Sequence, residues 1–322
     1  MLRNETRTSP DSPSGRDVGL WRALVVSPVS IWVRGARPRT LGASVTPVVV
    51  GTAAANEVVP WRFVAALLVG LGLQIGVNYA NDYHDGVRGV DTAERIGPPR
   101  LVSSGLASAR SVVLAALACI FVSGLAGLAL ALATTLWLVP LGATAMLALW
   151  LYSGGPRPYA ELGLGELMVF LYFGVLATAG TAFVHAESVP AAAWWSSAAV
   201  GFLAVAILVA NNLRDIETDA AAGRRTLAVR LGDGRTRGFY QACIVAAFLV
   251  AALGVIAEAI DEGIGITPWA LLAFGALPVA NRQIIAIAGA QGRALISVLV
   301  GTAVLQVVFG GLLAAGLWIG RT

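Results

Sequence analysis

The feature that most constrains this chain is a series of nine apolar stretches, separated by short segments rich in Gly, Pro and Arg. Stretches of about 20 apolar residues are what an α-helix needs to cross the hydrocarbon core of a bilayer. The sequence therefore predicts an all-α membrane protein with nine transmembrane helices. The predicted spans are residues 33–55, 61–82, 111–132, 136–152, 164–184, 191–212, 239–259, 267–288 and 295–319.

Composition and charge distribution agree with a membrane protein. With 57% hydrophobic residues, 12% charged residues and a mean hydropathy of +0.77, the chain is not a soluble domain. All 22 basic residues are Arg, and 20 of them fall in alternate segments that include the N-terminus. The positive-inside rule then predicts a cytoplasmic N-terminus and an external C-terminus, with only Arg62 and Arg321 outside. Because the arginines are dispersed among these loops, the net charge of +4 does not indicate nucleic acid binding.

The remaining segments suggest little chemistry. Residues 1–25 are polar and lack the apolar core of a secretory signal, so they are expected to form a disordered or surface-lying tail. Residues 26–322 are expected to form a single membrane domain. Cys119 and Cys243 both lie within apolar spans, where a small buried hydrophobe is the expected role.

Two polar patches interrupt the apolar pattern, and both follow the C-terminal end of a predicted span. Ionisable groups at membrane depth are costly, which favours a functional site. In the first patch, residues 78–91, the side chains that share one helical face are Asn78, Asn81, Asp82 and Asp85. In the second patch, residues 211–219, they are Asn211, Asp215 and Asp219. Four spans separate the patches, so both are predicted to lie on the cytoplasmic side and to converge.

Clustered carboxylates repel one another unless cations compensate, which favours a divalent metal. Mg²⁺ fits best because it prefers hard oxygen ligands and substrate phosphates, whereas the two histidines, His84 and His185, offer no zinc site. Arginines near the patches suit diphosphate oxygens, although topology alone could explain any one of them. These arginines are Arg88, Arg95, Arg100, Arg214 and Arg224. Polar patches that bind a diphosphate head, beside apolar spans that accept an apolar tail, predict a polyprenyl diphosphate as the substrate. Its tail would lie among membrane lipids.

Both patches resemble the signatures of a known family. The segment running Asn81-Asp82-Tyr83-x-Asp85, then Gly89-x-Asp91 and Arg95-Ile96-Gly97-Pro98, is similar to the first signature of the UbiA superfamily of intramembrane prenyltransferases. The segment from Asn212-x-Arg214-Asp215 to Asp219, continuing to Gly232, is similar to the second. The resemblance covers roughly residues 30–320, and it is greatest to the MenA branch, the 1,4-dihydroxy-2-naphthoate polyprenyltransferases of bacterial menaquinone synthesis.

The resemblance implies a fold and a reaction. The fold would be nine helices around a central cavity in the plasma membrane, with cytoplasmic helical caps from residues 84–108 and 213–237. The enzyme would join the polyprenyl group to 1,4-dihydroxy-2-naphthoate, releasing diphosphate and CO₂ and giving demethylmenaquinone. Other acceptors, such as 4-hydroxybenzoate or homogentisate, remain open, as does a transporter of anions or divalent cations. The sequence leaves the oligomeric state open.

The resemblance also implies roles for individual residues. Four catalytic aspartates would bind two Mg²⁺ ions, namely Asp82, Asp85, Asp215 and Asp219. Three further side chains would assist them, namely Asn78, Asp91 and Asn211. The acceptor would contact Arg157 and Tyr159, with Tyr152 and Glu166 as further candidates. Interfacial anchoring for the tyrosines and a helix-start charge for Glu166 are the alternatives.

Overall fold

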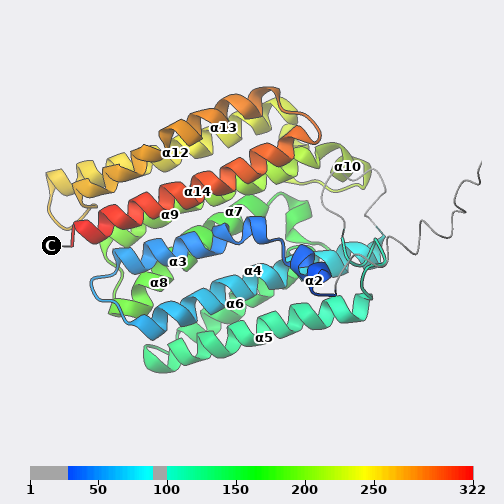
Figure 1. The fold of residues 1–322 in the computed structure, drawn as a ribbon, viewed down its shortest axis with the longest axis horizontal. Helices are drawn as coiled ribbons and strands as arrows, with labels where there is room; N and C mark the ends of the chain where they lie inside the picture. Colours follow the sequence, from blue (N-terminus) through cyan, green and yellow to red (C-terminus); the bar gives the residue numbers. More distant parts are fainter. Residues whose placement is uncertain (1–27, 90–99, 322) are drawn as a thin grey trace, which may run out of the picture.

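The computed structural model describes residues 28–89 and 100–321. In this part of the chain every regular element is a helix, and the long helices run side by side along one axis (Figure 1). The C-terminus lies at one end of the bundle, and helices α2 and α10 lie at the other (Figure 1). The predicted tail, residues 1–25, and the site residues Asp91 and Arg95 lie outside the described residues.

Seven helical segments are long and apolar enough to cross a membrane. They are α4 (Pro60–Arg88), α5 (Ala109–Ala133), the continuous segment of α7 (Gly165–Val169), η3 (Phe170–Leu176) and α8 (Ala177–Ala186), α9 (Ala191–Arg214), α12 (Asp233–Ile260), the continuous segment of η4 (Pro268–Ala276) and α13 (Leu277–Gly289), and α14 (Ala294–Ile319). The shorter elements are α2 (Pro28–Ala36), η1 (Pro38–Thr40), α3 (Gly42–Ala54), α6 (Leu138–Leu151), η2 (Tyr159–Leu162), α10 (Ile216–Ala221) and α11 (Leu227–Leu231).

The first predicted span, residues 33–55, is not one helix. Helix α2 ends at Ala36, and Arg37 adopts a left-handed conformation with φ 52° and ψ 67°. Proline disfavours helical geometry in the residue before it and is well suited to begin the next helix, so Pro38 opens η1. Helices α3 and α6 have 13 and 14 residues, shorter than the other spans. The count of nine spans therefore stays a prediction.

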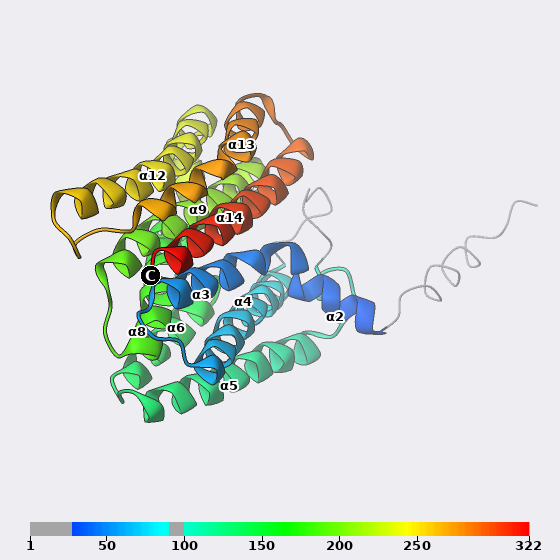
Figure 2. The ribbon, with the colours of Figure 1, turned by 60° about the vertical axis from the view of Figure 1, so that its left-hand side comes forward.

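Helix α9 forms the centre of the bundle, and α5 forms an edge. Of the most apolar 18-residue window, 67% is buried in α9 but only 17% in α5. Figures 1 and 2 both place α5 at one side of the bundle. Its exposed side chains are large and apolar, among them Phe121 and Leu132, as expected for a helix that faces lipid. The core that supports the polar patches is thus built around α9.

A close contact between two glycines explains an irregular turn in the third long segment. At Phe170–Leu176 the segment has π-helical hydrogen bonding where it packs against α9. A Cβ atom at Gly174 would lie 2.5 Å from the Cα of Gly201, so neither helix could carry a side chain at this crossing. A π-turn shifts the register of the residues that follow it, which allows the helix to keep this contact.

The two arginines predicted to lie on the external side of the membrane, Arg62 and Arg321, bind the ends of helices. Arg62 donates to the carbonyls of Val184 at 2.8 Å and Ala133 at 3.0 Å, near the ends of α8 and α5. Arg321 donates to the carbonyl of Thr52 at 2.5 Å, near the end of α3. The last carbonyls of a helix lack partners within it and attract cations. These two exceptions to the arginine pattern therefore have a structural role.

Candidate active site

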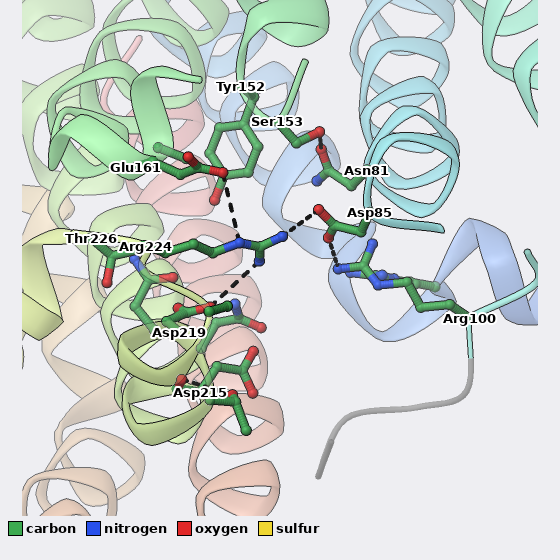
Figure 3. Close-up of a pocket in the computed structure, with 16 residues that line it drawn as sticks. Asn81, Asp85, Arg100, Tyr152, Ser153, Glu161, Asp215, Asp219, Arg224 and Thr226 are labelled. Carbon is green, nitrogen blue, oxygen red and sulfur yellow. Dashed lines mark hydrogen bonds and ion pairs between the residues drawn. The ribbon is translucent and has the colours of Figure 1, made fainter. Parts of the chain in front are cut away.

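The two polar patches meet in a pocket (Figure 3), which lies at the end of the bundle that carries α10 (Figure 1). The pocket has a volume of about 100 Å³. The residues that line it are Arg37, Asn81, Asp85, Arg100, Tyr152, Ser153, Ala160, Glu161, Asn211, Asn212, Asp215, Thr218, Asp219, Ala222, Arg224 and Thr226. Both patches contribute, so their predicted convergence is confirmed. The side of the membrane on which they lie stays a prediction.

Arg224 occupies the middle of the pocket and joins the two patches (Figure 3). Its guanidinium lies 2.5 Å from Asp85 of the first patch and 3.4 Å from Asp219 of the second. It also lies 3.7 Å from Glu161, in η2. A second guanidinium, that of Arg100, lies 2.5 Å from the other oxygen of Asp85. Two cations therefore neutralise the Asp85 carboxylate, which is only 4% exposed.

The protonation of Asp219 and Arg224 reflects this arrangement. Burial raises the pKa of Asp219 from its ordinary value to about 6, while Arg224 opposes the rise and Asp215 adds to it. Burial by itself lowers the pKa of Arg224, but Asp85 and then Asp219 outweigh it, so the net shift is upward. Arg224 therefore stays charged, and Asp219 sits where additional positive charge would favour its ionised form.

Arg214, at the end of α9, binds two side chains of the second patch. Its guanidinium forks onto Asp215, with Nε 2.7 Å from Oδ1 and Nη2 2.5 Å from Oδ2. The same Nη2 donates to Oδ1 of Asn211 at 3.0 Å. Arg214 does not line the pocket, whereas Asp215 and Asn211 do. The structure therefore places Arg214 against the predicted metal ligands, and not where it was predicted to meet a diphosphate.

Of the four first-patch residues on the predicted polar face of α4, only two line the pocket. Asn78 donates to the carbonyl of Ala36 at 3.0 Å, and Asp82 accepts hydrogen bonds from backbone N–H groups. Neither lines the polar pocket, but Asn81 and Asp85 do. Three residues along an α-helix turn the side chain by roughly 60° from its starting direction, which is enough to separate the two pairs.

A larger, apolar cavity adjoins the polar pocket inside the bundle. Its volume is about 350 Å³, and its lining includes aliphatic and aromatic side chains of α3, α4, α5, α6, α9 and the segment from α7 to α8. Four residues line both spaces, namely Arg37, Asn81, Tyr152 and Asn211. A molecule with a charged head and an apolar tail could therefore place each part in a matching environment.

Only two of the four predicted acceptor residues line the polar pocket or the apolar cavity. Tyr152 lines both spaces, and Tyr159 lines the apolar cavity. The two rings pack edge-to-face, with 5.5 Å between their centroids. Burial, and then Tyr172, raise the pKa of the Tyr159 phenol, which keeps it neutral and able to donate a hydrogen bond. Glu166 is buried and accepts from Nδ2 of Asn212 at 2.9 Å, and it lines neither space. Arg157 is exposed and lines neither space.

The predicted diphosphate residues are divided as well. Arg100 and Arg224 line the polar pocket, but Arg88 does not. Arg88 instead pairs with Glu161 at 3.0 Å and donates to the carbonyl of Gly155 at 2.5 Å. Arg88 therefore joins the end of α4 to the segment that follows α6.

Several pocket residues were not among the predicted site residues. Arg37 projects from the break between α2 and α3, and the Arg37-Pro38 step was a visible signal for that break. Ser153 donates to Oδ1 of Asn81 at 2.6 Å and lies 3.3 Å from Nδ1 of His84. Glu161 follows the fourth predicted span and carries no periodic signal. Only folding brings these three residues beside the aspartates.

Similarity to known proteins supports the same interpretation. Residues 44–294 match the UbiA prenyltransferase family. This chain belongs to that family. Among its UbiA relatives, the 1,4-dihydroxy-2-naphthoate octaprenyltransferase of Mycobacterium tuberculosis is 45% identical over 90% of this chain and 97% of the relative. The enzyme of the same name from Haemophilus influenzae is 33% identical over 93% of this chain and 99% of the relative.

Solved structures of UbiA proteins share the fold. A UbiA homolog from Archaeoglobus fulgidus bound to GPP and Mg²⁺ aligns with a TM-score of 0.61 at 17% identity, covering 88% of this chain and 99% of that one. A structure of a UbiA homolog from the same organism bound to Cd²⁺ aligns with a TM-score of 0.63 at 16% identity, covering 89% and 99% of the two chains. The all-helical UbiA architecture predicted from the two signatures is thus confirmed.

Proposed function

We propose that this protein transfers a polyprenyl group from a polyprenyl diphosphate to 1,4-dihydroxy-2-naphthoate in menaquinone biosynthesis. The observation that carries the proposal is the junction of a charged pocket with an apolar cavity at Tyr152 and Asn211. Relatives named for this reaction, 33% to 45% identical over most of the chain, support the choice of acceptor.

Mg²⁺ is the proposed cofactor, with two ions bound, and the donor chemistry of the pocket fits it. The carboxylates of Asp85, Asp215 and Asp219 and the amides of Asn81 and Asn211 present hard oxygen atoms of the kind Mg²⁺ prefers. Within residues 28–89 and 100–321, no three Asp, Glu, His or Cys side chains are grouped closely enough to hold a metal as they stand. The carboxylates are instead paired with arginines, so loading requires an exchange of partners.

The arginines of the pocket can make that exchange. Arg224 and Arg100 touch Asp85 in this structure, and both are positioned to turn their guanidinium groups toward diphosphate oxygens. When bound, Mg²⁺ supplies positive charge that stabilises the departing diphosphate. The arginines add to that charge, and Arg214 keeps Asp215 and Asn211 in place. In this way the residues favour breaking of the allylic carbon–oxygen bond.

The junction between the two spaces is where the allylic cation and the acceptor meet. The ring of Tyr152 borders both spaces, and an aromatic face stabilises a nearby cation while the apolar walls exclude water. Arg37 also borders both spaces and is assigned the acceptor carboxylate in place of Arg157. The naphthoate ring gains the prenyl cation and loses its carboxylate as CO₂, so atoms and charge balance. The product forms as the reduced quinol and gives demethylmenaquinone on oxidation.

The proposed membrane arrangement keeps the predicted topology. The nine spans lie in a bacterial plasma membrane, with the N-terminus and the mouth of the polar pocket cytoplasmic and the C-terminus external. Within the described part of the chain, residues 84–89, 100–108 and 213–237 form the caps at that mouth in this proposal. Three exposed arginines close in sequence to the pocket residues Arg37 and Arg224 support this orientation, namely Arg34, Arg39 and Arg225. Residues 26–322 form a single domain in this proposal.

The test is a comparison of acceptors with purified protein in lipid nanodiscs. Geranylgeranyl diphosphate and Mg²⁺ are supplied with 1,4-dihydroxy-2-naphthoate, 4-hydroxybenzoate or homogentisate, and products are identified by mass spectrometry. The expected result is a prenylated naphthoquinol and CO₂ only with the first acceptor, dependent on Mg²⁺ and reversed by chelation. Preference for another acceptor would overturn the choice of substrate. Flux of an anion or divalent cation into liposomes without any turnover would support a transporter instead.

A further inference from the structure

We propose that Asp82 is a positioning residue that fixes Arg100 in the pocket, although its place in the first patch makes it look like a metal ligand. The proposal rests on the proposed function, because it assigns Arg100 to the diphosphate. Asp82 and Asp85 are three residues apart on α4, but the structure gives their carboxylates different partners.

Both oxygens of Asp82 are engaged by the backbone. Oδ2 accepts from the N–H of Leu101 at 2.7 Å, and Oδ1 accepts from the N–H of Val102 at 2.9 Å. These two residues begin a turn in which the N–H of Ser104 bonds back to the carbonyl of Arg100 at 3.2 Å. The first N–H groups of such a turn have no partner within it, and a carboxylate that accepts them forms strong, charge-assisted bonds.

Packing fixes the same segment from its other sides. Leu101 is completely buried in a cluster with Tyr79 and Val112. A Cβ atom at Gly86 would lie 2.5 Å from the side chain of Val102, so the segment rests directly on the backbone of α4. With only 2% of Asp82 exposed, this carboxylate belongs to the wall behind the pocket.

The consequence for the pocket follows from chain connectivity. Arg100 immediately precedes the two residues held by Asp82, and its guanidinium lies 2.5 Å from Asp85. Loss of the Asp82 contacts would free the backbone that carries Arg100 while leaving the lining carboxylates untouched. Asp82 therefore acts on diphosphate binding through Arg100, and Asp85 acts at the pocket itself.

The experiment compares Asp82→Asn, Arg100→Gln, the double variant and Asp85→Asn as the control, all in lipid nanodiscs. Hydrogen exchange measured by mass spectrometry should speed up at residues 100–108 in Asp82→Asn. The KM for geranylgeranyl diphosphate should rise about tenfold in Asp82→Asn, as expected for loss of a hydrogen bond to a charged group, with kcat changed less. The double variant should show the KM of Arg100→Gln alone, because coupled sites are not additive.

Binding of Mn²⁺ to substrate-free protein, followed by electron paramagnetic resonance, separates positioning from ligation. Asp82→Asn should bind Mn²⁺ as tightly as the parent, and Asp85→Asn at least roughly tenfold more weakly. A loss of Mn²⁺ affinity in Asp82→Asn equal to that in Asp85→Asn, or KM effects that multiply in the double variant, would overturn the proposal.

A second variant covers the case in which Asp82→Asn does not fold. Gly86→Ala displaces Val102 from below without touching the carboxylate, and it should raise the same KM and speed the same exchange. Normal KM and exchange in folded Gly86→Ala would contradict the role assigned to residues 100–102. If the parent turned over no naphthoate, the proposed function would fail, whereas the exchange and Mn²⁺ measurements would still judge Asp82.

Discussion

Removal of Arg224 gives the sharpest test of how the pocket balances its charge. Arg224→Ala leaves Asp85, Asp219 and Glu161 facing one another without the cation that now lies between them. The 2.5 Å contact with the buried Asp85 carboxylate is worth about 2 kcal/mol. The longer contacts, at 3.4 and 3.7 Å, add about 0.5 kcal/mol each because they are weaker and more exposed.

The variant should therefore lose about 3 kcal/mol of stability when Mg²⁺ is absent, which corresponds to a fall in melting temperature of about 4 °C for a chain of this size. With Mg²⁺ present the loss should shrink, since the metal supplies the missing charge. The assay is a thermal melt followed by intrinsic fluorescence, in EDTA and in Mg²⁺. Arg235→Ala, an exposed arginine on α12, is the matched control and should show no such dependence. An equal loss in both buffers would refute the reasoning.

Three further expectations follow from the site and from the opposite end of the bundle. Asp215→Asn should lower kcat by at least roughly 100-fold, because it weakens both the metal site and the fork from Arg214, and steady-state kinetics with retained thermal stability would establish it. Arg37→Ala should raise the KM for the naphthoate about tenfold while Arg157→Ala leaves it unchanged; the opposite ranking would contradict the acceptor assignment. Arg62→Ala should destabilise the protein by about 2 kcal/mol in thermal melts with KM values unchanged, because it leaves the carbonyls at the ends of α5 and α8 unpaired; altered KM values would contradict a purely structural role.

The sequence predicted the helical membrane fold and the meeting of the two patches, because both depend on patterns that survive without tertiary detail. Apolar length identifies a span, and an even number of spans between two patches places them on one side. The split between α2 and α3 was harder to predict, because Gly42–Ala54 is apolar enough to extend a span, and only the geometry around Arg37-Pro38 breaks it.

The details of the first patch could not be predicted, because periodicity defines faces of a helix without saying which face meets which neighbour. Asn78 with Asp82 and Asn81 with Asp85 have the same spacing. The backbone of residues 101–102 engages Asp82, and the carbonyl of Ala36 accepts from Asn78, and both contacts lie outside the pattern of α4 itself. The position of Arg157 could not be predicted for a related reason, because the order of residues in a loop does not say which side chains point inward. Tyr159 lines the cavity, whereas Arg157 is exposed.

The shared border at Tyr152 has a consequence for what happens after the reaction. Under the proposed function, the two products form in different environments. The diphosphate lies in the charged pocket, and the prenylated ring lies in the apolar cavity. Under the proposed function, the ionic by-product can escape to water while the oily product passes sideways among the lipids. The enzyme thus delivers a hydrophobic electron carrier directly to the layer in which it works, and no soluble shuttle is needed.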